Sequence, residues 1–119
     1  MARARQPRKV DILGVQFSVI KSTKKMPDAT DHGETVVVER RIYLNPMVNK
    51  TPDDMASTFL HEVIHAILGV SGQDSLIKED HEEGLVTALE HGLYPLIKQG
   101  VFMPTKPTTR RGVKRDGKS

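Results

Sequence analysis

Two histidines four residues apart form the clearest chemical pattern in the chain. His61 and His65 flank Glu62-Val63-Ile64, so the segment is His-Glu-x-x-His. Because residues i and i+4 of a helix lie one above the other on the same face, both imidazoles can reach one metal ion. Zinc suits two neutral imidazoles plus a carboxylate, and a catalytic zinc keeps a fourth position for water, whose pKa falls towards 7. In such a site Glu62 is expected to be the general base on that water.

The absence of cysteine restricts the possible ligands of this metal. Disulfides and thiolate ligands are excluded, which leaves His, Asp and Glu. The alternative interpretation of the motif is a pair of core histidines with an incidental glutamate. Two polar rings in an otherwise apolar helix would need partners for their buried nitrogens, and a metal ion supplies one directly. The pattern therefore favours a Zn²⁺ site.

Three neighbouring residues further along the chain are candidates for the third ligand: His81, Glu82 and Glu83. Glu82 shares a helical face with the leucines and the valine that are expected to pack on the first helix, whereas Glu83 aligns with Glu90 on a more polar side. This phase predicts Glu82 as the third ligand, with Glu83 as the alternate. His81 ranks third, because solvent exposure is the more ordinary role for a histidine in an acidic run.

The His-Glu-x-x-His segment lies within a predicted long helix. Thr51 is a favourable N-cap, Pro52 suits the first helical position, and two aspartates follow in the first turn. The helix should run to about Leu68, with Gly69 placed to end it. Apolar residues recur at three- and four-residue spacings along it, which predicts a central, mostly buried helix. They are Met55, Phe59, Leu60, Val63, Ile64, Ile67 and Leu68.

A second helix is expected after a polar link from Ser71 to Ser75. It should begin between Ser75 and Asp80 and continue to about Gln99, where Gly100 closes it. This second helix carries the candidate third ligands. The metal site is therefore expected between two helices.

The first half of the chain has the composition of a small sheet. Val10 to Lys21 alternates roughly around Gly14, which predicts one strand with a bulge at the glycine. Lys24 to Gly33 is polar and aperiodic, as in a loop. Glu34 to Asn45 is rich in β-branched and aromatic residues and favours one or two extended segments, with Arg40-Arg41 at a tight connection or an exposed edge. The fold class is therefore α+β, with a small antiparallel or mixed sheet packed beside the two helices.

Length and charge predict one domain with two basic ends. The 119 residues suffice for a single core, placed at residues 10–103, between disordered segments at 1–9 and 104–119. The net charge of +3 arises largely in those ends, where a solubilising role is preferred and a weak nucleic-acid contact is the alternative. The sequence has no apolar leader and no membrane span, so a cytoplasmic location without membrane partners is expected. It says nothing about the oligomeric state.

Three stretches together resemble a known family, the minimal gluzincins, and in particular the short zincin-like metallopeptidases of phages and prophages. They are Gly33-Glu34-Thr35 leading to Arg41-Ile42-Tyr43-Leu44, then Leu60 to Ile67, then Glu82 to Leu89 followed by Gly92-Leu93. They cover about residues 33 to 97. The His-Glu-x-x-His motif is specific to zincins, the third stretch is moderately specific to the gluzincin arrangement, and the strand segment adds little.

The resemblance implies a zincin-like fold in which zinc binds His61, His65 and a glutamate of the second helix, with Glu62 as the catalytic base. In that family an edge strand lines the cleft and pairs with a substrate peptide, and Val36 to Leu44 is the candidate segment here. If the chain is phage-encoded, the location implied is the host cytoplasm. No residue stands out as the stabiliser of the developing oxyanion, for which the candidates are Tyr43, His91 and Tyr94.

The expected function is therefore a zinc-dependent metallopeptidase that hydrolyses peptide bonds of a protein target, with water activated by Glu62. The alternative is a catalytically silent zinc-binding scaffold that acts as a protein- or nucleic-acid-binding module. The sequence contains no helix-turn-helix pattern and no zinc-finger cysteine spacing, which favours the first function over nucleic-acid binding.

Overall fold

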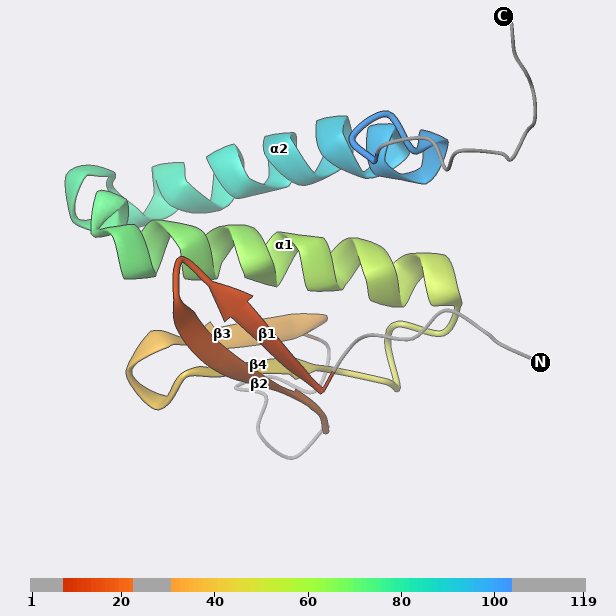
Figure 1. Cartoon of the computed structure of the whole chain (residues 1–119), viewed down its shortest axis with the longest axis horizontal. Coiled ribbons are helices and arrows are strands. Elements are labelled where there is room, and N and C mark those ends of the chain that lie inside the picture. The colour runs from red at the N-terminus through yellow and green to blue at the C-terminus, as the bar shows by residue number, and fades with distance from the viewer. Residues whose placement is uncertain (1–7, 23–30, 104–119) are drawn as a thin grey trace, which may run out of the picture.

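Four strands and two long helices make up the fold (Figure 1). A computed structural model of the chain describes residues 8–22 and 31–103. The strands are β1 (Lys9–Ile12), β2 (Val15–Lys21), β3 (Gly33–Val36) and β4 (Arg41–Leu44). The helices are α1 (Pro52–Ser71) and α2 (Glu79–Gln99), with short 3-10 turns η1 (Val37–Glu39) and η2 (Gln73–Leu76). This arrangement confirms the α+β class with a small mixed sheet and two helices.

The sheet has the strand order β1-β2-β4-β3, with β2 and β4 parallel and the two outer pairs antiparallel. The prediction of one bulged strand from Val10 to Lys21 was wrong. Leu13 and Gly14 have φ angles of 51° and 84°, and two successive residues of positive φ form the two-residue turn that matches the twist of a hairpin. The run therefore folds back on itself as β1 and β2.

The strand that forms the free edge next to the helices is β3. Arg40 adopts a left-handed conformation with φ of 55° at the end of η1, which confirms the tight connection expected there. Because β4 is paired on both sides, by β2 and by β3, the expectation that Val36 to Leu44 forms the cleft edge was wrong. The edge is Gly33–Val36. Most of the expected loop, residues 23–30, and both chain ends, residues 1–7 and 104–119, lie outside the described residues.

Helix α1 begins as the sequence predicted and ends three residues later than expected. The Thr51 hydroxyl accepts a hydrogen bond of 3.0 Å from the amide of Asp54, and Pro52 opens the helix. The C-cap is Gly72, with φ of 81°. Gly69 has a different role: a Cβ on it would lie 2.6 Å from Cγ2 of Val37, so a larger residue would push α1 away from η1.

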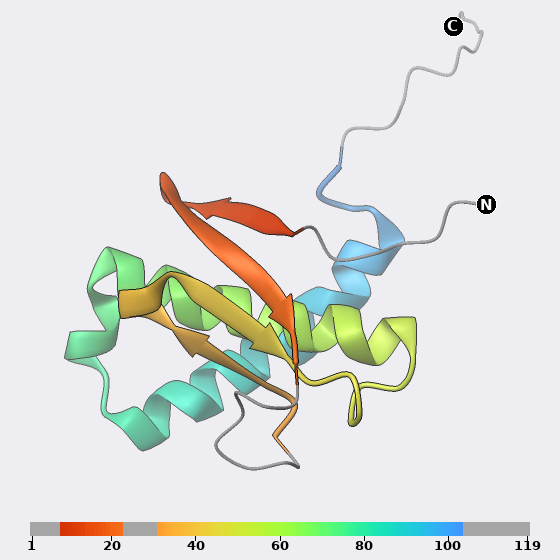
Figure 2. The ribbon, with the colours of Figure 1, turned by 90° about the horizontal axis from the view of Figure 1, so that it is seen from below.

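The molecule has three layers, with α1 between the sheet and α2 (Figures 1 and 2). The core lies between the sheet and the lower side of α1 and includes Phe17, Ile42, Leu44, Met55 and Ala66. Among the described residues no helix is both long enough and apolar enough to cross a bilayer.

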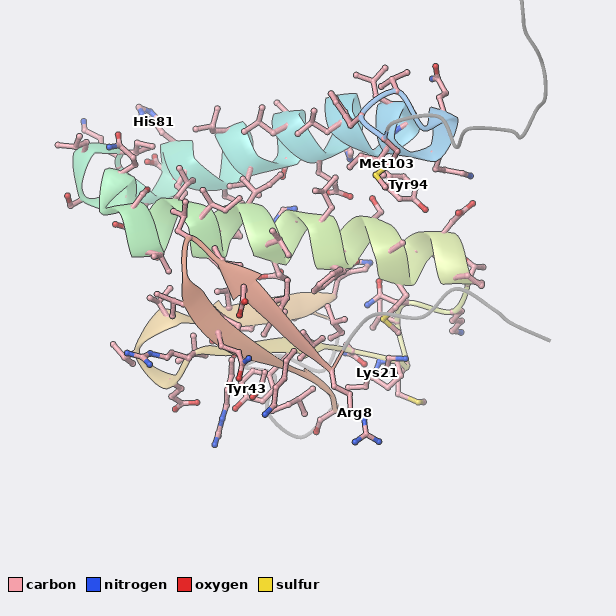
Figure 3. The ribbon with its side chains drawn as sticks, in the orientation of Figure 1. Arg8, Lys21, Tyr43, His81, Tyr94 and Met103 are labelled. Carbon is pink, nitrogen blue, oxygen red and sulfur yellow. The ribbon has the colours of Figure 1, made fainter. Side chains whose placement is uncertain are left out.

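Helix α2 packs on α1 through a side that is partly apolar and partly polar. Val86 is its one buried residue, whereas Leu85 and Leu89 are 41% and 38% exposed. The expected apolar packing side is therefore only partly buried. Figure 3 shows His81 pointing outward from α2. Three carboxylates of α2 contact the histidines of α1, and these build the site.

Candidate metal centre

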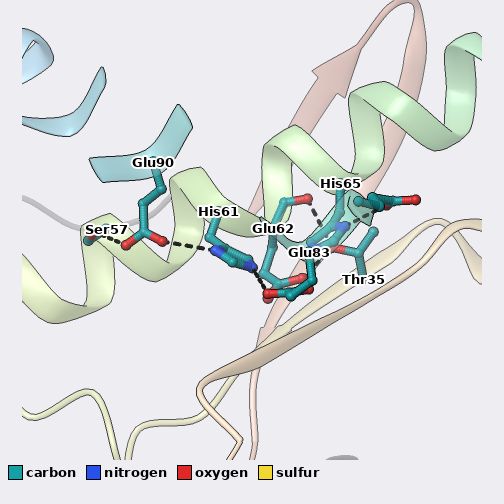
Figure 4. A network of polar contacts seen from close by, with 8 residues as sticks. Thr35, Ser57, His61, Glu62, His65, Glu83 and Glu90 are labelled. Carbon is teal, nitrogen blue, oxygen red and sulfur yellow. Dashed lines mark hydrogen bonds and ion pairs between the residues drawn. The ribbon is translucent and has the colours of Figure 1, made fainter. Parts of the chain in front are cut away.

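Two ring nitrogens from α1 and one carboxylate from α2 converge at the centre of the site (Figure 4). Nε2 of His61 lies 2.8 Å from Oε2 of Glu83, and Nε2 of His65 lies 3.0 Å from Oε1 of the same residue. The two imidazole rings are 5.0 Å apart between centroids. One ligand atom from each of the three residues lies within 4.8 Å of the others, so this group could hold a metal ion.

Two further carboxylates of α2 hold the opposite nitrogens of the rings. Nδ1 of His61 lies 2.8 Å from Oε1 of Glu90, and Nδ1 of His65 lies 2.7 Å from Oε2 of Glu82. A neutral imidazole that donates from Nδ1 to a carboxylate has its lone pair on Nε2. Glu82 and Glu90 therefore favour the tautomer in which both Nε2 atoms can bind a cation. The hydroxyl of Ser57, one turn before His61, donates in turn to Glu90.

The geometry of the three candidate ligand atoms, and their access to solvent, suit a small divalent cation. Ligands about 2.0–2.1 Å from a tetrahedral ion are about 3.4 Å from one another, so the observed nitrogen–oxygen separations need to widen by only about half an ångström. The side chains of His61 and His65 are 16% and 19% exposed, and that of Glu83 is 60% exposed. Two partly buried carboxylates, those of Glu82 and Glu90, thus hold the rings, whereas the Glu83 side chain is exposed to solvent.

Glu62 lies beside this group without belonging to it. Its side chain is buried, and its Oε1 accepts a hydrogen bond of 2.7 Å from the Thr35 hydroxyl, which also lies 2.9 Å from the Glu62 carbonyl oxygen. Burial raises the pKa of Glu62, and the bond from Thr35 and the nearby histidine charges offset that rise only in part. A raised pKa suits a carboxylate that accepts a proton and passes it on.

The surroundings of His61 act on its pKa in opposite directions. Burial lowers it, whereas the hydrogen bond to Glu90 and the charges of Glu62, Glu83 and Glu90 raise it, and the net direction is upward. In the metal-free protein these carboxylates therefore favour the imidazolium form. A metal ion competes with that proton, because a histidine ligand must be neutral at the binding nitrogen.

The edge strand β3 approaches Glu62 closely at Gly33. A Cβ on Gly33 would lie 2.8 Å from the carbonyl oxygen of Tyr43 and 3.1 Å from Cγ of Glu62. Only glycine leaves room for both neighbours. The strand β3 thus places both its backbone edge and the Thr35 hydroxyl beside the Glu62 carboxylate.

Two buried asparagines fix the segment that leads into β3. Nδ2 of Asn49 donates to the carbonyl oxygen of His32 at 2.9 Å, and Nδ2 of Asn45 donates to that of Asp31 at 2.8 Å. Oδ1 of Asn49 accepts a bond of 2.7 Å from the Thr58 hydroxyl on α1. Because these groups are buried and satisfied, they tie the start of β3 to the helix that carries the histidines.

A cleft of about 750 Å³ runs along β3 past the group. Its walls come from the segment entering β3, from β3 itself, from the histidine face of α1 and from the carboxylates of α2. Val37 and Asp74 line it beyond the end of β3. The free edge of the sheet, the possible ligands and Glu62 therefore share one cavity.

The structure brings together most of the site residues expected from the sequence. His61, Glu62 and His65 line the cleft, but Glu83, the alternate, faces both Nε2 atoms, while the preferred Glu82 contacts Nδ1 of His65. Glu82 was favoured because the apolar side of α2 was expected to lie against α1. In the structure Glu82 does face α1 and is 18% exposed, but its carboxylate contacts Nδ1 of His65, whereas the 60% exposed Glu83 contacts both Nε2 atoms.

Two of the three candidate oxyanion stabilisers lie elsewhere. The Tyr43 hydroxyl bonds to Glu39, and the Tyr94 hydroxyl donates to Asp53 at 2.9 Å near the far end of the helix pair (Figure 3). Neither lines the cleft, whereas His91 does.

The sequence interpretation gave no role to Glu90, Ser57 or Thr35. A signal for Glu90 was available, because it follows Glu83 by seven residues and so lies on the same side of α2 two turns later. Ser57 likewise precedes His61 by four residues. The contact of Thr35 with Glu62 spans 27 residues of sequence and has no local signal.

Comparisons of the chain with protein-family profiles, with characterised proteins and with solved structures gave no significant match. The geometry and chemistry of the cleft therefore indicate the function.

Proposed function

We propose that the protein is a zinc-dependent metallopeptidase with His61, His65 and Glu83 as ligands and Glu62 as the general base. The observation that carries this proposal is the position of Glu62. It is buried beside the three candidate ligands and held by Thr35, yet it is not one of them. A purely structural metal site has no need of a fourth, separately held carboxylate.

Zinc supports the assignment because two imidazoles and one carboxylate are a common ligand set of catalytic zinc. Bound there, zinc would supply Lewis acidity, which polarises a peptide carbonyl and makes water a better nucleophile near neutral pH. Glu62 would accept the proton of the attacking water and deliver it to the leaving amine. Glu82 and Glu90 would orient the two rings, and His91, which lines the cleft, would donate to the developing oxyanion.

The free edge of β3 supports a peptide as the substrate. An extended peptide can add to an unpaired strand edge through backbone hydrogen bonds, which bind many sequences with modest selectivity. Gly33–Val36 is such an edge, and it lies along the same cleft as Glu62. A substrate strand bound there would carry its peptide bonds past the candidate metal group.

The test is hydrolysis of a fluorescently labelled unfolded protein by the zinc-loaded wild type and by Glu62→Gln. Loss of the base is expected to lower kcat by roughly 10²- to 10⁴-fold while zinc content stays the same. Asp11→Asn, on β1 at the opposite edge of the sheet, is the matched control and should keep full activity. Equal hydrolysis by wild type and Glu62→Gln would refute the peptidase function, and the binding-scaffold alternative would replace it.

A further inference from the structure

We infer that the cleft takes cationic peptide segments, with lysine or arginine side chains on both sides of the bond to be cleaved. This substrate class rests on the proposed peptidase function. It is carried by the charge of the cleft and by the positions of Asp31, Glu34 and Asp74, which are not part of the candidate metal group.

The cleft gathers acidic residues in a chain that is basic overall. Seven of the 15 acidic residues of the chain line it, whereas no described lysine or arginine does. The seven are Asp31, Glu34, Glu62, Asp74, Glu82, Glu83 and Glu90. Even with a divalent cation bound and Glu62 protonated, the carboxylates outnumber the positive charges. The low-dielectric walls of a cleft concentrate such a field, which attracts cations and repels acidic peptides and nucleic acid.

Four of the seven carboxylates lie in the metal group or beside it, and three lie outside it. Asp31, Glu34 and Asp74 form no ion pair with any other described residue. Carboxylates beside a substrate cleft are natural partners for ammonium or guanidinium groups. A cationic side chain of a bound peptide would find its partners among these three.

Asp31 and Asp74 lie towards opposite ends of the cleft. The segment that enters β3 lies near Thr58, since Asn49 donates to the carbonyl oxygen of His32 and accepts from the Thr58 hydroxyl. A Cβ on Gly33, the first residue of β3, would be 3.1 Å from Cγ2 of Thr58 and equally from Cγ of Glu62. Asp74 lies against Gly69, with its Oδ2 3.6 Å from a Cβ built there. Both histidines of the metal group lie between these two points of α1.

The separation of the two ends matches a short extended peptide. Thr58 and Gly69 are eleven residues apart on one helix, which corresponds to about 16 Å at a rise of ~1.5 Å per residue. An extended peptide covers this distance in about five residues at ~3.3 Å each. A peptide bond centred at the metal group would thus place the third residue on either side of that bond near Asp31 and near Asp74.

The test compares three ten-residue peptides, acetylated and amidated, that differ at two positions, the third residue on either side of the central bond. Those positions carry lysine, norleucine, which keeps an apolar stem without the charge, or glutamate. Binding to the zinc-loaded Glu62→Gln protein is measured by fluorescence anisotropy, and kcat/KM is measured with the wild type. The lysine peptide should bind roughly tenfold more tightly than the norleucine peptide, and 0.5 M NaCl should reduce that preference.

Matched variants locate the effect. Asp31→Asn and Asp74→Asn should each reduce the lysine preference by roughly two- to fivefold, as expected for partly exposed ion pairs, whereas Asp11→Asn should leave it unchanged. Equal affinity for lysine and norleucine peptides, with all three cleaved at the same kcat/KM, would overturn the substrate class and leave the peptidase function intact. If the wild type cleaves none of them while Glu62→Gln keeps the lysine preference, the peptidase function fails and the cationic ligand stands.

Discussion

The hydroxyl of Thr35 on β3 lies 2.7 Å from Oε1 of Glu62 on α1, so the edge strand and the proposed base are joined by a direct hydrogen bond. Thr35 sits on the strand along which a substrate peptide is proposed to bind. Any shift of that strand would therefore move the donor that orients the base. In the proposed function, substrate binding and proton transfer would therefore be coupled through the Thr35 side chain.

Thr35→Val should lower kcat roughly tenfold or more, because a hydrogen bond to a charged group contributes roughly 1.5–3 kcal/mol. Zinc content should not change, since Thr35 contacts none of the three ligand side chains. Thr35→Ser keeps the hydroxyl and should restore most of the activity. Steady-state kinetics with a labelled peptide checks this. Equal rates for the valine and wild-type proteins would remove Thr35 from the mechanism.

Glu90→Ala should weaken zinc binding by roughly 10- to 100-fold, the usual effect of removing a partner that orients a histidine ligand. Ser57→Ala, which removes only the donor to Glu90, should have a smaller effect in the same direction. Competition with a chromophoric chelator gives both affinities. Asp11→Ala serves as the control for loss of an acidic residue outside the cleft. Unchanged affinity in Glu90→Ala would mean that His61 needs no partner on Nδ1.

Gly33→Ala should destabilise the protein by about 1–3 kcal/mol, because the added methyl group would meet the Tyr43 carbonyl oxygen and Cγ of Glu62. Gly84→Ala is the matched control, since a Cβ there meets nothing within 4 Å and alanine is the better helix former by roughly 0.5–1 kcal/mol. Urea unfolding should therefore show opposite shifts of midpoint for the two variants. Shifts in the same direction would contradict the close approach of β3 to α1.

Asp53 on α1 accepts hydrogen bonds from Lys98 at 3.0 Å and from Tyr94 at 2.9 Å, both on α2. The bond from Lys98 lowers the pKa of Asp53, and the bond from Tyr94 adds to this effect. A carboxyl with a lowered pKa in the folded state stabilises the fold above its unfolded-state pKa, and this stabilisation is lost as the pH falls through the folded-state pKa.

The stability difference between wild type and Lys98→Met should therefore be present at pH 6 and shrink as the pH drops below the ordinary range of aspartate, about 4. Urea midpoints between pH 6 and pH 2.5 measure this difference. Lys78→Met, in the link before α2, controls for the loss of one positive charge. A difference that stays constant over the whole range would show that Asp53 does not pair the two helices.

Local signals allowed the helices and the histidine motif to be predicted from the sequence. The Thr51-Pro52 start of α1, the Gly100 end of α2 and the i, i+4 spacing of His61 and His65 all depend on neighbouring residues. The hairpin at Leu13-Gly14 was missed because leucine rarely adopts a positive φ. Its sequence gave no stronger turn signal than a single glycine.

Features that depend on contacts between distant residues could not be predicted from the sequence. The edge position of β3 follows from the parallel pairing of β4 with β2, which no local pattern indicates. The contacts of Glu82 and Glu83 have a related cause. Helical phase placed Glu82 on the side of α2 that faces α1, but it does not determine which ring nitrogen each carboxylate meets, because this depends on how the two helices are aligned along each other.

The zinc content of the purified protein tests the central claim most directly, measured by elemental mass spectrometry after incubation with one equivalent of zinc and dialysis. Wild type should hold about one zinc per chain, Glu82→Ala should still bind zinc with reduced affinity, and Glu83→Ala should lose it. A wild type that takes up no zinc, or a Glu83→Ala protein that keeps it while Glu82→Ala does not, would contradict the assignment of His61, His65 and Glu83 as the ligands.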